Sequence, residues 1–188
     1  HTVDVRGIGG SETAAIKMAE EFVKLGYTVK VYNSCGPNGE GIYNGVEYYL
    51  SEKCDKIDCD ILIGSRNADL ANVNVNAKKR YLWVHDVHPY NLTKEIYDKL
   101  DGIFVLSNWH KDNVKSFYDF IKEDKLIVTS NGINFERFNK QVDRDPYKVV
   151  MSSSPDRYLP SLLQMWERIK KEVPEAKLNI CYGFENWE

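Results

Sequence analysis

The chain has no hydrophobic run close to the length that crosses a bilayer, which takes about 20 apolar residues. Its charge is also nearly balanced, with 25 Lys and Arg against 28 Asp and Glu and a formal net charge of −3. This gives no reason to expect nucleic acid or an anionic membrane as the main partner. The length of 188 residues allows one domain, or two small ones. We expect a globular protein without a spanning segment, and peripheral contact with a membrane stays open.

Cysteine is scarce, with four residues in the whole chain. Cys54 and Cys59 are separated by four residues, but no second close pair and no pair of histidines completes a zinc pattern. The sequence therefore predicts no metal site. With no secretory leader in view, reduced thiols and a cytoplasmic location are the expectation.

Three glycines within four residues precede the apolar-periodic segment Ala14–Leu25. Such glycines let the backbone approach a ligand, and the amide end of the following helix attracts an anion. A plain strand-to-helix turn capped by Ser11 explains the same residues. A dinucleotide fingerprint is disfavoured, because Glu12 stands in place of its last glycine and the strand predicted over Tyr27–Tyr32 ends without an acidic residue. The motif reads Gly7-Ile8-Gly9-Gly10-Ser11-Glu12.

Short β-like runs alternate with helical periodicity along the chain, which predicts an α/β fold with a Rossmann-like parallel sheet covered by helices. Near residue 139 the chain becomes polar and charged, and then the alternation restarts. We predict an N-terminal domain over residues 1–139, a linker over 140–147 and a first βαβ unit over 148–188. One such unit cannot close a domain, so the second domain is expected to be incomplete. The predicted elements include helices over Ala14–Leu25, Thr93–Leu100 and Leu159–Val173, a helix capped by Ser107, a buried strand at Ile61–Ile63, further strands over Val46–Leu50, Tyr81–Val84, Ile103–Leu106, Leu126–Thr129, Val149–Ser152 and Leu178–Tyr182, and a loop over Asn33–Gly45.

Polar residues follow several of the predicted strands, and ligands of open α/β sheets bind beyond the carboxyl ends of the strands. His85 and Asp86 come directly after one apolar run, and Arg66 follows another. A histidine titrates near neutrality, and a cation such as Arg157 at the start of a helix can bind a diphosphate. Plainer interpretations also exist: a histidine bonded to backbone, an aspartate that forms a turn, and a solvated arginine.

In their order and spacing, these motifs resemble the retaining nucleotide-sugar glycosyltransferases of family 4, whose GT-B fold has two facing Rossmann-like domains. The resemblance extends across nearly the whole chain. It covers the N-terminal, acceptor-side domain of the family and the opening of the C-terminal, donor-side domain. The segments that carry it are Gly7–Glu12 with its helix, Gly26–Val29, Trp83–Asp86, Val105–Trp109, Ser130–Asn134 with Phe138, Ser153–Arg157 and Leu178–Gly183.

The resemblance implies a retaining hexosyltransferase that moves a sugar from a nucleotide-diphosphate-sugar donor to a glycan or lipid-linked acceptor. It implies no essential metal or other cofactor, because cationic side chains and a helix dipole neutralise the leaving diphosphate. Prearranged donors of this kind stabilise the charge most strongly in the transition state. The implied site residues are His85 as the catalytic residue that contacts the sugar, Gly9, Gly10 and Arg157 for the donor, and Glu12, Arg66 and Asp86 on the acceptor side.

Three features depart from the family. The family's first strand, expected before the glycine loop, is missing unless Thr2–Val5 supplies part of it. Tyr158 stands where a glycine often follows the arginine, and the paired glutamates that grip the donor would lie beyond Glu188. We therefore expect the chain as given to lack a complete donor site. A non-catalytic α/β module that binds a glycan or another protein is the main alternative, and a dinucleotide oxidoreductase is less favoured.

Overall fold

The computed structural model describes residues 9–34, 36 and 38–181 of the chain. The chain divides into two compact units, His1–Ile133 and Asn134–Glu188. Each unit contains parallel strands of its own. The predicted boundaries, with a first domain over 1–139, a linker over 140–147 and a second domain over 148–188, stay predictions.

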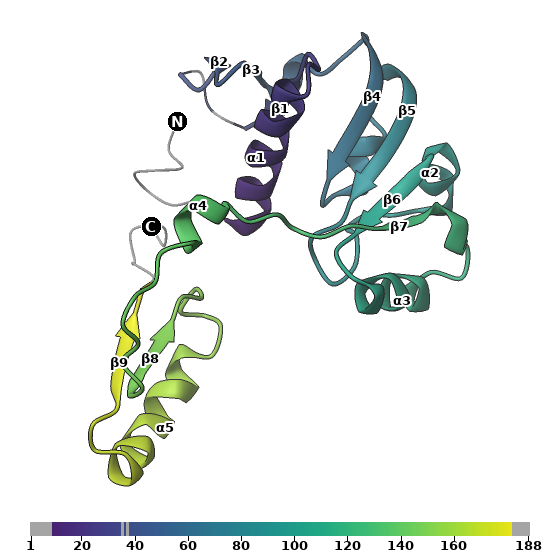
Figure 1. Cartoon of the computed structure of the whole chain (residues 1–188). Helices are drawn as coiled ribbons and strands as arrows, with labels where there is room; N and C mark the ends of the chain where they lie inside the picture. The colour runs from purple at the N-terminus through teal and green to yellow at the C-terminus, as the bar shows by residue number, and fades with distance from the viewer. Residues whose placement is uncertain (1–8, 35, 37, 182–188) are drawn as a thin grey trace. The chain divides into compact units, whose positions relative to one another are not determined.

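The larger sheet of the first unit is all-parallel and has four strands. They are β4 (Ile57–Ser65), β5 (Val75–Trp83), β6 (Gly102–Val105) and β7 (Leu126–Val128), hydrogen-bonded in the order β4-β5-β6-β7. The helices α2 (Lys94–Lys99) and α3 (Asn108–Phe117) flank this sheet (Figure 1). This mixed α/β arrangement is consistent with a Rossmann-like fold and confirms the predicted parallel sheet with helices.

The main core lies on the face of this sheet that α2 and α3 cover. Leu82, Val84, Ile103 and Val105 of the central strands are completely buried and belong to one cluster with Val114 of α3. Burying a side chain of this size contributes about 1.5–3 kcal/mol, so this layer stabilises the sheet from which the candidate site residues extend.

One prediction is wrong for the opposite face of this sheet. The sequence predicts a buried strand at Ile61–Ile63, but Ile61 is 54% exposed and Ile63 is 37% exposed. The register pairs Ile63 with Tyr81, so its side chain points away from the face that carries Leu82. An apolar run alone does not say which face of a strand a helix will cover.

Gly64 of β4 is required by close packing. A Cβ there would lie 2.5 Å from the backbone nitrogen of Ala71, in the short 3-10 helix η3 (Ala68–Ala71). Gly64→Ala should therefore destabilise the protein by about 1–3 kcal/mol, the usual effect of overpacking. Urea unfolding measures this, and Gly132→Ala is the control, because no described atom lies within 4 Å of its Cβ position. Equal unfolding midpoints for the two variants would contradict the packing argument.

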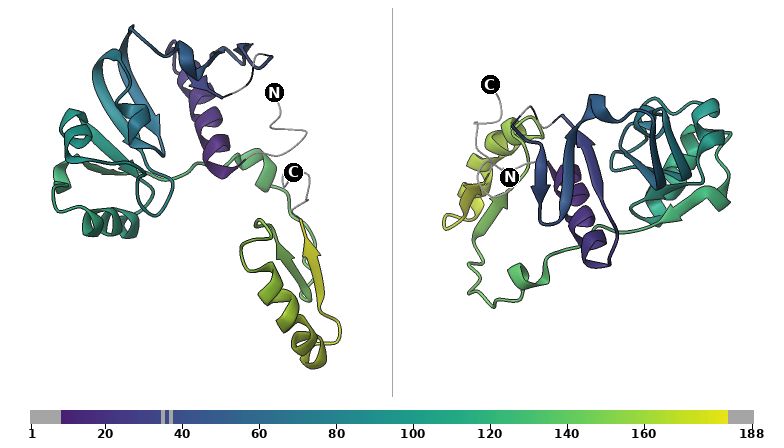
Figure 2. Two further views of the ribbon diagram at one scale, coloured as in Figure 1. Left: turned by 180° about the vertical axis from the view of Figure 1, so that it is seen from behind. Right: turned by 90° about the horizontal axis from the view of Figure 1, so that it is seen from above.

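The first unit also contains the helix α1 (Gly10–Lys24) and a smaller sheet of β1 (Lys30–Asn33), β2 (Gly41–Tyr43) and β3 (Val46–Leu50). β1 is parallel to β3, and β2 is antiparallel to it. Figure 2 shows from two further sides that α1 lies along this sheet. Their contact is a second apolar cluster built on Ala19, Val46 and Tyr48. Gly26 follows α1 with a φ of 92°, as expected of a glycine at this end of a helix.

The predicted loop over Asn33–Gly45 contains the strand β2, so this part of the prediction is wrong. Asn44 and Gly45 both have positive φ angles, 51° and 81°, and join β2 to β3. Asn-Gly is the preferred pair for a two-residue hairpin turn, since both residues tolerate this conformation. The turn signal was present in the sequence, but the surrounding glycines and polar residues concealed the strand before it.

The second unit contains α4 (Phe135–Phe138), β8 (Lys148–Met151), α5 (Leu159–Glu172) and β9 (Lys177–Ile180). β8 and β9 pair in parallel on either side of α5 in the sequence, so the predicted βαβ unit is confirmed. The last residue of the predicted strand Leu178–Tyr182 lies outside the described residues.

None of the helices formed by residues 9–34, 36 and 38–181 combines the length and the apolar character needed to cross a bilayer. The predicted cytoplasmic location stays a prediction.

Candidate functional site

The parallel register brings Arg66, His85 and Asp86 to one edge of the larger sheet. Ser65 at the end of β4 pairs with Trp83 at the end of β5. The next residues of both strands therefore leave the sheet at the same edge. In open α/β sheets, ligands bind beyond this edge, at the carboxyl ends of the strands. The backbone N–H of Arg66 donates to the carbonyl of Trp83 at 2.8 Å, which keeps the two strand ends together.

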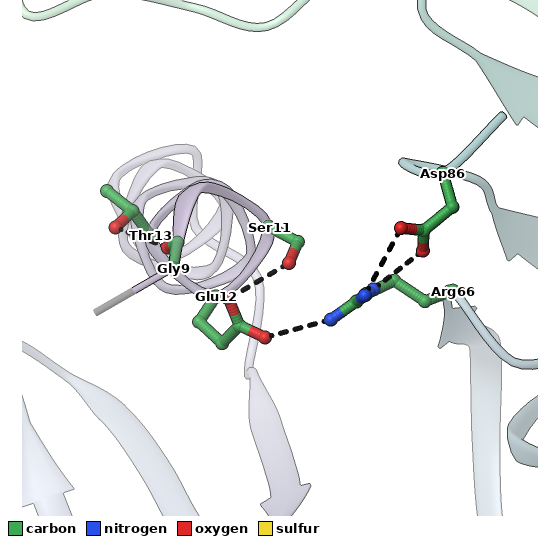
Figure 3. Close-up of polar contacts among 6 residues, drawn as sticks. All are labelled: Gly9, Ser11, Glu12, Thr13, Arg66 and Asp86. Atoms are coloured by element: carbon green, nitrogen blue, oxygen red, sulfur yellow. Dashed lines mark hydrogen bonds and ion pairs between the residues drawn. The ribbon is translucent and has the colours of Figure 1, made fainter. Parts of the chain in front are cut away.

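Arg66 connects this edge to the first turn of α1. Its Nε and Nη2 donate to the two carboxylate oxygens of Asp86 at 2.8 and 3.2 Å, and its Nη1 donates to Glu12 Oε1 at 3.2 Å. Figure 3 shows the guanidinium between the two carboxylates. The hydrogen bonds to Asp86 raise the pKa of Arg66, and the charges of Asp86 and Glu12 raise it further. Burial lowers this pKa, but its effect is outweighed. These contacts fix a planar cation at the edge of the sheet.

The backbone of Arg66 has a left-handed conformation with a φ of 70°, which is uncommon for a residue other than glycine. Two contacts with Tyr90 support it: the N–H of Tyr90 donates to the carbonyl of Arg66 at 3.4 Å, and Asn67 forms a bridge with Tyr90. Residues held in this region concentrate at functional sites.

Glu12 folds back over the amide end of α1. A Cβ on Gly9 would lie 2.2 Å from Glu12 Oε2, so a larger residue at this position would make the flexible carboxylate move. Burial raises the pKa of Glu12, but hydrogen bonds from its own backbone N–H, from Ser11 and from Arg66 outweigh this effect, so that the pKa lies below its ordinary value. A negatively charged group of the protein itself thus lies where the sequence predicts an external anion.

The helix start differs from the simple turn that the sequence allows. Gly9 is the residue that precedes α1, and Ser11 lies inside the helix and donates to Glu12 Oε2 at 2.9 Å instead of capping it. The carbonyl of Gly9 accepts from the N–H of Thr13 at 3.0 Å and from its hydroxyl at 2.9 Å. Gly10 has no described atom within 4 Å of its Cβ position, so the space beside it is open. Gly7 lies outside the described residues.

His85 is half-buried beside Trp83, with 4.3 Å between the ring centroids. Its Nε2 is buried and makes no hydrogen bond to any residue that the structure describes. Burial lowers the pKa of His85; the charge of Asp86 opposes this, and that of Arg66 adds to it. The ring is therefore neutral at pH 7 and can both donate and accept a hydrogen bond. A buried polar atom without a partner is uncommon and calls for an explanation such as a bound ligand or water.

His110 is a residue that the sequence analysis missed. It lies in the first turn of α3, is only 5% exposed, and its Nδ1 accepts a hydrogen bond from the N–H of Leu106 at 3.2 Å. Its Nε2 is buried and, within the described residues, also lacks a partner. The available signal was its place three residues after Ser107, whose hydroxyl caps α3 by accepting from the N–H of His110 at 3.0 Å.

Arg157 belongs to the second unit, where it lines a cavity of about 360 Å³. The cavity lies at the carboxyl end of β8 and the start of α5, and no described residue forms an ion pair with Arg157. Tyr158 precedes α5 with a φ of 67°, a left-handed conformation that glycine adopts without strain. The other lining residues are Val150, Met151, Ser152, Ser153, Tyr158 and Leu162.

The structure thus brings six of the seven predicted site residues together at one edge of the first unit. The role of Arg157 beside them stays a prediction, because it belongs to the other unit. Among the described residues, no group of three or more His, Cys, Asp and Glu side chains could hold a metal ion. The six residues are Gly9, Gly10, Glu12, Arg66, His85 and Asp86.

No protein-family model, curated protein or solved structure matches this chain in comparisons with known proteins. The family that the motifs resemble is therefore a proposal.

Proposed function

We propose that this chain is the acceptor-side domain, with the opening of the donor-side domain, of a retaining GT-B glycosyltransferase. It moves a hexose from a nucleotide-diphosphate sugar to a glycan or lipid-linked acceptor. The observation that carries the proposal is the buried Nε2 of His85, which has no hydrogen-bond partner among the described residues. It lies next to the Arg66–Asp86 pair, at the edge where α1 begins. Such an edge supplies a hydrogen-bonding group for a sugar, and the amide end of α1 favours a phosphate once the Glu12 carboxylate turns away.

The chemistry requires the bond between the anomeric carbon and the diphosphate oxygen to break and a bond to the acceptor oxygen to form. Negative charge develops on the leaving diphosphate, and one of its oxygens takes up the proton that the acceptor hydroxyl loses. Neutral His85 offers a hydrogen bond to the sugar, and the amide end of α1 at Gly9 and Gly10 favours the phosphate. Arg157, with the hydroxyls of Ser152 and Ser153 around its cavity, fits the leaving diphosphate.

One observation favours a second candidate, a non-catalytic module that binds a neutral glycan. The carboxylate of Glu12 lies over Gly9 and opposes a phosphate at the amide end of α1. For the glycosyltransferase, Glu12 has to turn away or bind a sugar hydroxyl when the donor arrives. Calorimetric titration of the chain with nucleotide-diphosphate sugars and with free oligosaccharides separates the two candidates. Heat from the nucleotides supports transfer, and heat from the oligosaccharides alone would refute it.

Gly10→Ala tests the donor site without disturbing the fold. Because the Cβ position at Gly10 is open, the substitution should leave the stability unchanged or raise it by up to about 1 kcal/mol, since alanine favours the helix. The added methyl group would stand where the proposed phosphate approaches, so the affinity for a nucleotide diphosphate should fall at least about tenfold, a difference of about 1.4 kcal/mol.

Met18→Ala is the matched control for this titration. Met18 is 37% exposed and lies on the same helix, just over two turns from Gly10. Its affinity for the nucleotide should equal that of the unchanged protein. Unchanged affinity in Gly10→Ala would place the phosphate elsewhere.

A further inference from the structure

An exposed aromatic surface lies beside the candidate site. It is formed by Val87, His88, Tyr90, Trp109, Asn113 and Phe117. Apart from His88 and Asn113, these side chains are between 50 and 66% exposed. Single exposed apolar side chains are normal on a folded protein, whereas a contiguous group marks a binding surface.

The contacts between α3 and the segment after Asp86 make this surface contiguous. Trp109, Asn113 and Phe117 follow one another at steps of four residues, so they lie on one side of α3. The side-chain amide of Asn113 donates to the carbonyl of Val87 at 2.8 Å. The rings of Phe117 and His88 lie with 5.0 Å between their centroids. The stripe of α3 therefore runs along this segment.

The segment that carries Tyr90 is fixed to the rest of the unit. The hydroxyl of Tyr118 donates to the carbonyl of Pro89 at 2.9 Å, and Pro89 itself is buried. The N–H of Ala68 donates to the carbonyl of Tyr90 at 2.9 Å. The rings of His88 and Tyr90 lie with 6.1 Å between their centroids. A surface that is fixed in this way loses little conformational freedom when a ligand binds.

The aromatic surface continues directly into the candidate site. The N–H of Tyr90 donates to the carbonyl of Arg66 at 3.4 Å. Val87 follows Asp86, whose carboxylate accepts from Arg66 Nε at 2.8 Å. The Arg66–Asp86 pair thus borders the aromatic surface. A ligand with several units in a row can therefore contact the rings and this pair at the same time.

The composition of the aromatic surface suits an uncharged, hydroxylated ligand. None of its six residues is Lys, Arg, Asp or Glu. A sugar ring has an apolar face of C–H groups, which packs on a flat aromatic ring, and hydroxyls around its edge. The indole N–H of Trp109 and the hydroxyl of Tyr90 can donate to such hydroxyls. A row of rings with polar edges therefore fits an oligosaccharide.

A membrane and a protein fit this surface less well. An anionic membrane is bound through Lys and Arg, but both lysines in the second half of the contact helix, Lys111 and Lys115, bind Glu123 at 2.7 and 3.0 Å. A stable interface with a protein takes about 20–30 residues from each partner, many more than this surface offers. The charge and the size of the surface both favour the oligosaccharide.

We infer that the aromatic surface binds a neutral oligosaccharide, one end of which reaches Arg66 and Asp86. Its use as the acceptor of sugar transfer rests on the proposed function. The binding itself does not, because it needs no donor and no reaction.

NMR titration of the ¹⁵N-labelled chain with neutral oligosaccharides tests this binding. The probes are linear oligosaccharides of glucose, mannose, galactose and N-acetylglucosamine. At least one of them should shift the indole N–H signal of Trp109 together with the backbone amides of Val87 and Tyr90, with one dissociation constant. If none of them shifts these signals at millimolar concentration, the inference is overturned. Binding of phospholipid vesicles through Trp109 in place of any oligosaccharide would assign the surface to a membrane and overturn it as well.

Variants of Trp109 locate the bound oligosaccharide. Trp109→Ala should weaken the binding at least about tenfold, since an exposed tryptophan at a binding surface often carries much of the affinity. Trp109→Tyr keeps a flat ring with a polar edge and should retain most of the affinity. Phe135→Ala is the control, because Phe135 is also exposed but belongs to the second unit. Its affinity should equal that of the unchanged chain, and an unchanged affinity in Trp109→Ala would remove the aromatic surface from the binding site.

The inference and the proposed function can fail separately. If an oligosaccharide shifts the Trp109 signal but no nucleotide-diphosphate sugar binds to the chain, the proposed function fails and the aromatic surface remains a glycan-binding site. If a nucleotide-diphosphate sugar binds near Gly10 but no oligosaccharide reaches Trp109, the inference fails and the proposed transferase uses another acceptor.

Discussion

Replacing Arg157 with alanine should lower sugar transfer by the natural protein about 10²–10³-fold, which corresponds to roughly 2.7–4 kcal/mol of barrier. The reason is that the guanidinium lines the cavity at the start of α5, where we propose that the leaving diphosphate gains charge in the transition state. The variant should fold normally, because the side chain forms no ion pair with any described residue. Initial rates with a nucleotide-diphosphate sugar at saturating acceptor measure the effect.

Arg168→Ala is the matched control for this experiment. Arg168 lies on α5, the helix that begins two residues after Arg157, is exposed, and does not line the cavity. Arg168→Ala removes the same charge from the same unit as Arg157→Ala. A general effect of losing positive charge would therefore be equal in the two variants. Equal rates in the two variants would remove Arg157 from the proposed site.

His85→Ala should have the second large effect, a loss of about 10²–10³-fold in kcat, as expected when one prearranged hydrogen-bonding group is removed. Its Nε2 is buried without a partner among the described residues, so a sugar hydroxyl gives it one only when substrate is bound. His85→Gln keeps a hydrogen-bonding group in reach and should recover part of the activity. Steady-state kinetics of the two variants, read with their unfolding midpoints, measure this.

The distinction between kcat and stability matters for His85. Its pKa is lowered by burial in the folded protein, so the unfolded chain binds more protons below pH 6.5 and protonation of this ring disfavours the fold. Removing the ring should therefore make the fold less sensitive to acid as the pH falls below about 6.5, while the activity at pH 7 is lost. Retained activity in His85→Ala would refute its assignment as the catalytic residue.

Much of the fold could be predicted because its signals are local. Thr93 and Ser107 are both caps, with hydroxyls that accept from Ile96 and His110, as their places before helical segments indicate. The alternation of apolar runs and helical periodicity gave the parallel sheet. Such signals depend on neighbours within four residues, which a sequence shows directly.

The candidate site was less accessible to prediction because its contacts are remote in the sequence. Arg66 and Glu12 are 54 residues apart, and no local sequence pattern indicates that the guanidinium of Arg66 binds both Glu12 in α1 and Asp86. The folding of Glu12 over Gly9 depends on a side-chain rotamer. The exposed face at Ile61 and Ile63 depends on where helices pack, which a strand's own residues do not determine.

The central claim is that the phosphate of a nucleotide-diphosphate sugar binds at the backbone amides that begin α1 in the first unit. Amide chemical-shift mapping of the ¹⁵N-labelled chain with a nucleotide diphosphate tests it most directly. We predict that the amides of Gly9 and Gly10 shift together and saturate with one dissociation constant. Shifts confined to other residues, or none at millimolar nucleotide, would contradict the claim.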